Sequence, residues 1–218
     1  MPSELADPVA HLLRCLDDPR PRSLVALAGV PGAGKSTVAA HLARAVNEAV
    51  GAPVMVALGM DGFHLPRAAL AALPDPELAF ARRGAPWTFD PAALAARLAA
   101  LRCAAGECDV PWPGFEHDVG DPVEGATTVP AAARVMLVEG NYLLLADDGW
   151  SAVGARCDQH WFLDVPLDLA LERLARRHMA AWGMTRAQAE ARIAGNDRLN
   201  AELILTTRAR AEWSLRNT

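Results

Sequence analysis

Gly29-Val30-Pro31-Gly32-Ala33-Gly34-Lys35-Ser36-Thr37 joins an apolar run, Leu24–Ala28, to a segment with helical spacing of apolar residues, Ser36–Val50. Glycines let backbone amides turn inward around an anion. The start of a helix adds roughly half a positive charge at the same place. Because the turn lies between a strand and a helix, the stretch predicts a loop that wraps phosphate groups, and a ligand-free turn is a poor alternative.

Within this loop, each residue type has an expected task. Lys35 should reach the β- and γ-phosphates of a nucleotide, the Ser36 hydroxyl should ligate Mg²⁺, and Thr37 should contact the α-phosphate. Among 21 basic residues, Lys35 is the only lysine, which marks a position that needs a compact point charge. The predicted ATP-binding residues are Gly29, Pro31, Gly32, Ala33, Gly34, Lys35, Ser36 and Thr37.

Short apolar runs alternate with helical patterns along the rest of the chain. The predicted strands are Leu24–Ala28, Val54–Leu58, Arg134–Val138, His160–Val165 and a shorter Ala211–Leu215. The predicted helices are Ser36–Val50, Pro91–Ala104 and Leu167–Trp182. Nearly continuous apolar strands separated by helices predict an α/β fold with a doubly wound parallel sheet. Two segments rich in Pro and Gly, 59–90 and 106–130, should lie at the carboxyl edge of that sheet, where ligands bind.

Length and composition restrict the classes of protein. The 218 residues suit a single domain, 1–218, and the net charge of −5 argues against a nucleic-acid partner. No apolar run approaches the roughly 20 residues that span a bilayer, and no signal-peptide order is present, so we expect a cytoplasmic protein with no membrane partner. The four cysteines lack metal-site spacing. An N-terminal helix and several tryptophans suit either a core or a subunit contact, which leaves a homodimer open.

Two acidic residues follow predicted strands. Asp61 comes after Val54–Leu58 and is the candidate base that accepts the proton of a hydroxyl during phosphoryl transfer; the alternative is an ordinary Asp-Gly turn. Nearby His64 either helps to hold the substrate or packs in the turn. Glu139 ends the strand Arg134–Val138 and is expected to order Mg²⁺ or the substrate loop, with a structural ion pair as the alternative.

A predicted helix carries three arginines on one face. Arg173, Arg176 and Arg177 have spacings of three and four. An arginine face after this strand predicts a lid, 167–195, that covers the γ-phosphate, with Arg173 and Arg177 as catalytic residues beside Asp61 and Lys35. The alternative is a solvated face on which Arg176 pairs with Glu172.

Taken in order, five segments of the chain resemble the branch of P-loop kinases that contains uridine kinase, phosphoribulokinase and bacterial pantothenate kinase. The likeness is strongest to the fructose transport system kinase or nucleoside/nucleotide kinase proteins of that branch. It runs from about Leu24 to the end of the chain. The segments are the loop at 29–37, Met60–Leu65, Arg83–Asp90, Val138–Leu144 and Gly195–Ala201. The resemblance implies the P-loop NTPase fold, with about five strands in the order 2-3-1-4-5 and a helical lid.

The same resemblance implies roles for individual residues. Asp61 matches the catalytic aspartate, Glu139 the acid after the Walker B strand, and Arg173 and Arg177 the lid arginines. Residues expected to line the acceptor site are His64, Arg83, Phe115, His117, Glu139 and Tyr142, and Tyr142 is alternatively a packed core residue. Uridine kinases carry a tyrosine in place of His64 and usually Tyr-Asp-Phe in place of 115–117, so the acceptor stays open among a sugar, a nucleoside and a pantothenate-like alcohol.

Together these features predict an ATP- and Mg²⁺-dependent phosphotransferase acting on a small-molecule hydroxyl. A GTPase is excluded because its guanine-reading Asn-Lys-x-Asp needs a second lysine. Two alternatives are a non-catalytic nucleotide-binding regulator and a nucleoside monophosphate kinase. The second would use Arg67, Arg82 and Arg83 to grip the acceptor phosphate.

Overall fold

The computed structural model describes residues 6–116, 120–147 and 149–217. Its centre is a five-stranded sheet in the order β2-β5-β1-β6-β7, with every neighbouring pair parallel. The strands are β1 Ser23–Ala28, β2 Met55–Gly59, β5 Val135–Gly140, β6 Gln159–Asp164 and β7 Trp213–Arg216. β1 lies between β5 and β6, with Ser23 opposite Val135 and Val25 opposite Gln159. Counted along the chain, these strands give the predicted order 2-3-1-4-5.

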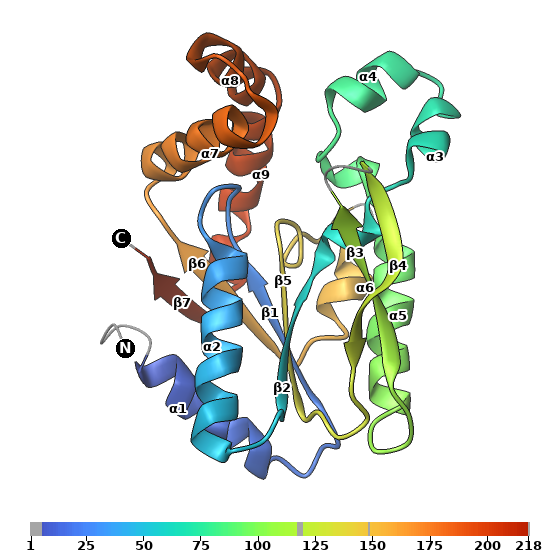
Figure 1. The fold of residues 1–218 in the computed structure, drawn as a ribbon, viewed down its shortest axis with the longest axis vertical. Coiled ribbons are helices and arrows are strands. Elements are labelled where there is room, and N and C mark those ends of the chain that lie inside the picture. The colour runs from blue at the N-terminus through green and yellow to red at the C-terminus, as the bar shows by residue number, and fades with distance from the viewer. Residues whose placement is uncertain (1–5, 117–119, 148, 218) are drawn as a thin grey trace.

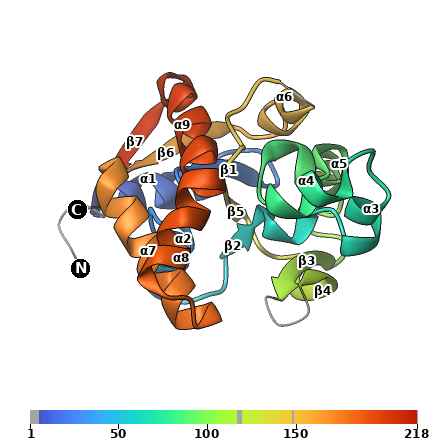
Figure 2. The ribbon, with the colours of Figure 1, turned by 90° about the horizontal axis from the view of Figure 1, so that it is seen from above.

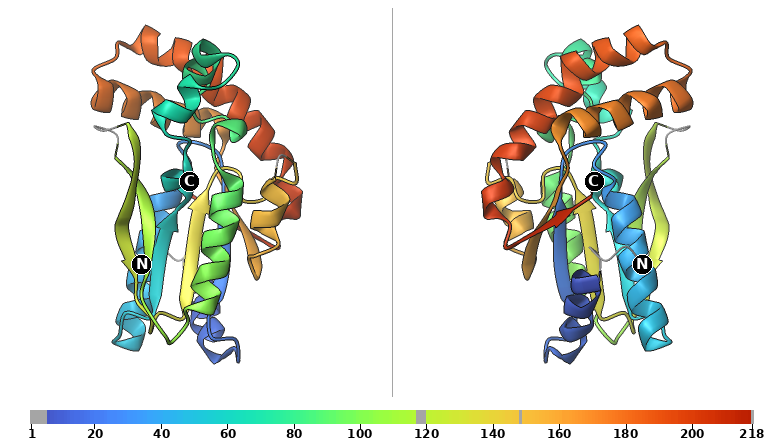
Figure 3. Two further views of the ribbon diagram at one scale, coloured as in Figure 1. Left: turned by 90° about the vertical axis from the view of Figure 1, so that its right-hand side faces the viewer. Right: turned by 90° about the vertical axis from the view of Figure 1, so that its left-hand side faces the viewer.

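Helices cover both faces of the sheet. Figures 1 and 3 place α2 against one face and α5 with α6 against the other. The helices are α1 Ala6–Arg14, α2 Lys35–Val50, α3 Arg67–Ala71, α4 Pro76–Ala81, α5 Pro91–Cys103, α6 Trp150–Gly154, α7 Leu167–Trp182, α8 Arg186–Arg192 and α9 Arg198–Thr206. The three predicted helices are present within one residue of their expected ends. α5 starts as its sequence indicates, since the Asp90 side chain accepts from the Ala93 amide ahead of a first-turn proline.

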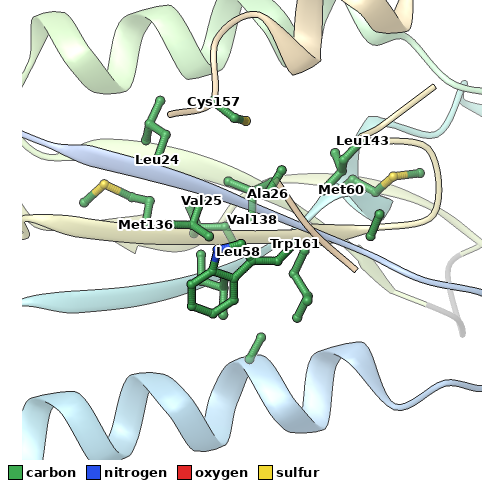
Figure 4. Close-up of a cluster of buried hydrophobic side chains, with 14 of the residues drawn as sticks. Leu24, Val25, Ala26, Leu58, Met60, Met136, Val138, Leu143, Cys157 and Trp161 are labelled. Carbon is green, nitrogen blue, oxygen red and sulfur yellow. The ribbon is translucent and has the colours of Figure 1, made fainter. Parts of the chain in front are cut away.

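The apolar strands form the core. Every residue of β1 is buried, as expected of a strand covered on both faces. Figure 4 shows Leu58 and Trp161 directed to the α2 side of the sheet, and Leu24 and Cys157 directed to the opposite side. The core therefore has two layers, one on each face of the sheet, and the loops at the strand ends rest on a rigid base.

The two predicted excursions contain regular structure that their composition hid. Segment 59–90 holds the 3₁₀ turns η3 Met60–Phe63 and η4 Pro86–Thr88 as well as α3 and α4. Segment 106–130 holds an antiparallel hairpin, β3 Val110–Glu116 and β4 Asp121–Val129. The hairpin was not predicted because prolines within both strands argue against a sheet interior. A two-stranded ribbon has only edge strands, so it tolerates these prolines.

The carboxyl ends of the parallel strands face a space flanked by helices. Seen from above, α7, α8 and α9 stand on one side of this edge and α3 and α4 on the other (Figure 2). The turn η5, Ile193–Asp197, is a single π-helical turn that connects α8 to α9. Within the described residues, no helix combines the length and apolar character needed to cross a bilayer.

Candidate active site

The phosphate loop follows β1 and requires glycine at two places. Gly32 and Gly34 have φ angles of 81° and 89°, in the left-handed region that favours glycine. A Cβ atom at Gly32 would also lie 2.1 Å from the carbonyl oxygen of Ala170, in α7. The loop is therefore packed directly beneath the helix predicted to form the lid, and its shape depends on that contact.

Lys35, the first residue of α2, lies inside the loop. Its Nζ donates to the carbonyl oxygens of Gly29 at 2.9 Å and Val30 at 3.1 Å, and to Oδ1 of Asn141 at 2.7 Å. The side chain is buried, and burial lowers the pKa of the ammonium, an effect that the nearby Glu139 opposes. The lysine is thus held by neutral oxygens that a phosphate group can replace.

Two polar side chains meet beside Lys35. The Ser36 hydroxyl donates to Oε1 of Glu139 over 2.7 Å. Burial raises the pKa of Glu139, the Lys35 ammonium lowers it, and the Asp61 carboxylate raises it further. A carboxylate and a hydroxyl this close to the lysine form a small oxygen-rich corner at the ends of β5 and the phosphate loop.

A cavity of about 430 Å³, here named the loop cavity, opens above these groups. It is lined by Pro31, Gly32, Gly34, Lys35, Ser36, Thr37, Asp61, Glu139, Gly140, Asn141, Arg173, Leu174 and Arg177. Two of the three arginines that the helical spacing places on one face, Arg173 and Arg177, thus line the cavity together with the phosphate loop. Arg176 does not join them: it is 76% exposed and its Nε donates to Glu172 over 2.9 Å.

A second cavity of about 280 Å³, here named the lid cavity, adjoins the first. The two share four lining residues: Pro31, Asp61, Asn141 and Arg177. The rest of the lid cavity is lined by His64, Arg83, Gly84, Phe89, Phe115, Gly120, His178, Trp182, Arg192, Asp197 and Asn200. Because Asp61 borders both spaces, a group bound in one cavity can face a group bound in the other across its carboxylate.

Several predicted acceptor residues do line the lid cavity. The His64 ring lies between those of Phe89 and Phe115, with centroids 3.9 and 4.7 Å away. The Arg83 guanidinium lies over Phe115, 5.2 Å from its centroid. The predicted contact His117 lies outside the described residues.

Arg83 is committed to its surroundings. It donates to the carbonyl oxygens of Gly120 at 2.6 Å and Leu65 at 3.1 Å, and it pairs with Asp121 at 3.3 Å. Burial lowers the pKa of the guanidinium while Asp121 raises it. The side chain fixes the loop that forms one wall of the lid cavity.

Two further predicted contacts face elsewhere. Tyr142 is buried behind the wall, and its hydroxyl donates to the Gly84 carbonyl over 2.5 Å, so it lines neither cavity. Glu139 lines the loop cavity and is absent from the lid cavity. Two of the predicted loop residues, Gly29 and Ala33, line neither cavity. The carbonyl oxygen of Gly29 nevertheless accepts a hydrogen bond from Lys35.

Residue-by-residue reasoning predicted Arg177 in the lid but missed the side chains that η5 and α9 contribute to this wall. Asn196 is buried: its Oδ1 accepts from Arg82 Nε at 3.0 Å and its Nδ2 donates to the Arg83 carbonyl at 3.0 Å. Asn200 accepts from Arg82 at 3.2 Å. Two signals could have found these residues. Polar side chains recur at a spacing of four in an otherwise helical stretch, and the segment Gly195–Ala201 is one of those that resemble the kinase family. The side-chain amides of Asn196 and Asn200 therefore join the lid to loop 82–84.

The described residues contain no group of three or more His, Cys, Asp or Glu side chains able to hold a metal ion. Mg²⁺ at phosphoryl-transfer sites is usually held by one or two protein ligands together with phosphate oxygens and water. Ser36 and Glu139, 2.7 Å apart on the wall of the loop cavity, match that pattern.

Comparison with known proteins gives several matches along most of the chain. A Schizosaccharomyces pombe protein named "putative uridine kinase" is 39% identical over 84% of this chain and 78% of its own length. An ATP-dependent kinase-like protein of Aspergillus versicolor is 41% identical over 68% of this chain and 88% of its own. A solved structure from Silicibacter sp. TM1040, described as a "putative fructose transport system kinase", aligns with a TM-score of 0.82 and 36% identity, covering 94% of this chain and 98% of that one. No protein-family model matches.

Proposed function

This chain belongs to the uridine kinase-like family of P-loop kinases, and we propose that it moves the γ-phosphoryl group of Mg-ATP onto a hydroxyl seated beside Asp61. Its homologues make it an ATP-dependent small-molecule kinase. The observation that carries the assignment of sites is the pair of adjoining cavities. The nucleotide phosphates occupy the loop cavity and the acceptor occupies the lid cavity, with Asp61 on the shared border.

The proposed transfer needs positioning and charge more than covalent chemistry. Asp61 accepts the hydroxyl proton as the acceptor oxygen bonds to the γ-phosphorus and the bond from that phosphorus to the β-γ bridging oxygen breaks, which leaves ADP. Lys35 exchanges its carbonyl and amide partners for phosphate oxygens, and Arg173 and Arg177 spread the charge that develops on the transferred group. Ser36 and Glu139 would hold Mg²⁺, which neutralises charge on the phosphates when bound.

The acceptor-side arginines favour a hydroxyl acceptor over a nucleoside monophosphate. Arg82 donates to the amide oxygens of Asn196 and Asn200, and Arg83 is paired with Asp121. Arg67 lies over the Phe80 ring, 5.2 Å from its centroid. Two of the three, Arg82 and Arg83, are thus already paired within the protein, whereas the alternative would require them to grip a second phosphate.

The test is ADP release from Mg-ATP with a panel of acceptors: uridine, cytidine, pantothenate, D-fructose, D-glycerate, ribulose 5-phosphate and nucleoside monophosphates. One acceptor should raise turnover well above the acceptor-free rate, and product phosphorylated on a hydroxyl should appear in equal amount. Transfer onto an existing phosphate instead would reject the proposed reaction.

A further inference from the structure

Asp197 is an unassigned carboxylate on the wall of the lid cavity. It is the last residue of the π-turn η5, and its side chain is 13% exposed. Its Oδ2 lies 3.0 Å from Nε2 of His178, a buried residue of α7. His178 in turn stacks on Trp182, with ring centroids 4.6 Å apart and planes inclined by 13°. The carboxylate is therefore held in one orientation by a packed imidazole.

Other contacts already hold the lid together, so a role in lid packing does not account for the Asp197 carboxylate. The apolar cluster Leu171, Leu174, Ala175, Ala189 and Ile193 already packs α7 against α8 and η5. The neighbouring Asn196 already ties the π-turn to loop 82–84. π-helical turns inside helical segments are frequent at functional sites, because the extra residue directs side chains that a regular helix would turn away. Here the turn directs Asn196 to the loop and Asp197 to the cavity.

The same lid carries a donor without a partner. Arg192 lies over Trp182, 4.9 Å from its ring centroid, and its buried Nε has no hydrogen-bond partner within the described part of the chain. The buried Nε of Arg83, which also lines this cavity, shares that condition. Leaving buried donors of this kind unpaired costs free energy.

The mixture of charges around the lid cavity selects its ligand. An anionic group would meet the carboxylates of Asp61 and Asp197, and a cationic group would meet the guanidinium groups of Arg83, Arg177 and Arg192. A hydroxyl group is both donor and acceptor. It can donate to Asp197 while accepting from one of the arginines that line the same cavity, and the rings of Phe89, Phe115 and Trp182 suit the apolar faces of a ring.

We propose that Asp197 is a specificity-determining residue that binds hydroxyl groups of a neutral, polyhydroxylated acceptor, and that His178 positions it. The ligand chemistry is that of a free sugar, a polyol or the ribose of a nucleoside. The inference rests on the proposed function, because it assigns the lid cavity to the acceptor.

Asp197→Asn keeps the size of the side chain and removes its charge, and it is the principal test. Binding of D-fructose, sorbitol and uridine is measured by calorimetry in the presence of Mg²⁺ and a non-hydrolysable ATP analogue, and KM by ADP release. At least one probe should bind to the parent protein, and its Kd and KM should rise about tenfold or more, while the KM for ATP stays constant. Glu202→Gln, an exposed carboxylate on α9, should change neither constant.

A second pair of variants tests the positioning role. His178→Ala should raise the acceptor KM with a smaller change in kcat, and His178→Gln, which retains an N–H donor, should restore part of the affinity. A purely structural histidine would lower the thermal midpoint of unfolding in both variants without separating KM from kcat. If Asp197→Asn fails to fold, Arg192→Ala tests the same recognition from the end of α8.

The outcomes separate the inference from the proposed function. Preference for anionic probes such as ribulose 5-phosphate or UMP, with an unchanged KM in Asp197→Asn, overturns the inference and leaves the kinase intact. Failure of all neutral probes to bind also overturns it. Neutral probes that bind in an Asp197-dependent way without any ADP release overturn the proposed function and support the binding assignment. Affinity for D-fructose or sorbitol against uridine distinguishes a free sugar or polyol from a nucleoside.

Discussion

The loop cavity and the lid cavity adjoin at Asp61 but are built in different ways. The loop cavity takes much of its lining from one stretch, Pro31–Thr37, whose glycines present backbone groups to the ligand. The lid cavity is assembled from residues of distant segments, including 61–64, 83–89, 177–192 and 197–200 together with Phe115 and Gly120. Backbone groups bind the same ligand whatever the neighbouring side chains are. The ligand preference of a cavity built from dispersed side chains changes when any one of them is replaced.

That difference explains why the donor of the phosphoryl group is easier to identify than its acceptor. The phosphate loop has one sequence form for a whole class of ligands. Specificity in the lid cavity arises from many substitutable contacts, so related chains can share a fold and a loop while using different acceptors. Variants on the two sides of the shared border should therefore affect different constants.

The largest effect is expected at the border itself. Asp61→Asn should lower kcat by about 10²–10⁴-fold, the usual contribution of a positioned general base, and leave ATP affinity unchanged. Measurements of steady-state turnover and of nucleotide binding by calorimetry check both parts. Turnover that survives the substitution would remove Asp61 from the role of base.

A matched pair of arginines on α7 tests the loop cavity. Arg173→Ala should lower kcat on the order of 10²-fold, because a charge directed at the transferred group is lost. Arg176→Ala should leave kcat unchanged, since this side chain is 76% exposed and its ion pair with Glu172 contributes little. Equal losses of kcat in the two variants would contradict the conclusion that Arg173 faces the loop cavity and Arg176 does not.

On the lid side, Asn196→Ala should separate stability from nucleotide binding. It leaves Arg82 Nε and the Arg83 carbonyl unpaired, which costs about 1–3 kcal/mol of unfolding free energy. The acceptor KM should rise because loop 82–84 loses its tether, with the KM for ATP constant. Urea unfolding and steady-state kinetics measure these effects, with Glu202→Ala on the exposed face of α9 as control. A rise in the KM for ATP without a rise in the acceptor KM would contradict the conclusion that Asn196 acts on the acceptor side.

The smallest effect concerns pH. Burial lowers the pKa of Lys35 from its ordinary 10.5, so the free protein loses this positive charge at a lower pH than an exposed lysine would. The Kd for ATP should rise with pH above that lowered pKa, by about tenfold per unit. Lys35→Arg, which stays charged, should bind more weakly at neutral pH and lack this dependence. A Kd that begins to rise only at or above pH 10.5, the ordinary pKa of a lysine, would contradict the prediction.

The strands and helices of the parallel sheet were predictable because buried strands, capped helices and the phosphate loop all carry local signals, whereas the strand order came from the resemblance to P-loop kinases. Leu167–Trp182 was placed to the residue, and Asp90 capped α5 as expected. The roles assigned to Asp61, Lys35, Arg173 and Arg177 remain predictions, although the structure gathers all four around one cavity. The sequence indicated part of the lid cavity, through His64, Arg83 and Phe115. The remainder was missed because it depends on a π-turn and on pairings across more than a hundred residues, such as Arg82 with Asn196, that have no local pattern.

The central position of β1 also has a consequence for how the chain acquires its activity. Its partners in the sheet begin at Val135 and Gln159, so Ser23–Ala28 must wait for segments far along the chain before its hydrogen bonds can form. Non-local parallel pairing of this kind is slow and leaves apolar edges exposed meanwhile. The phosphate loop follows the end of β1, so nucleotide binding should report late events in refolding. ATP should bind and stabilise only those chains whose sheet is already assembled.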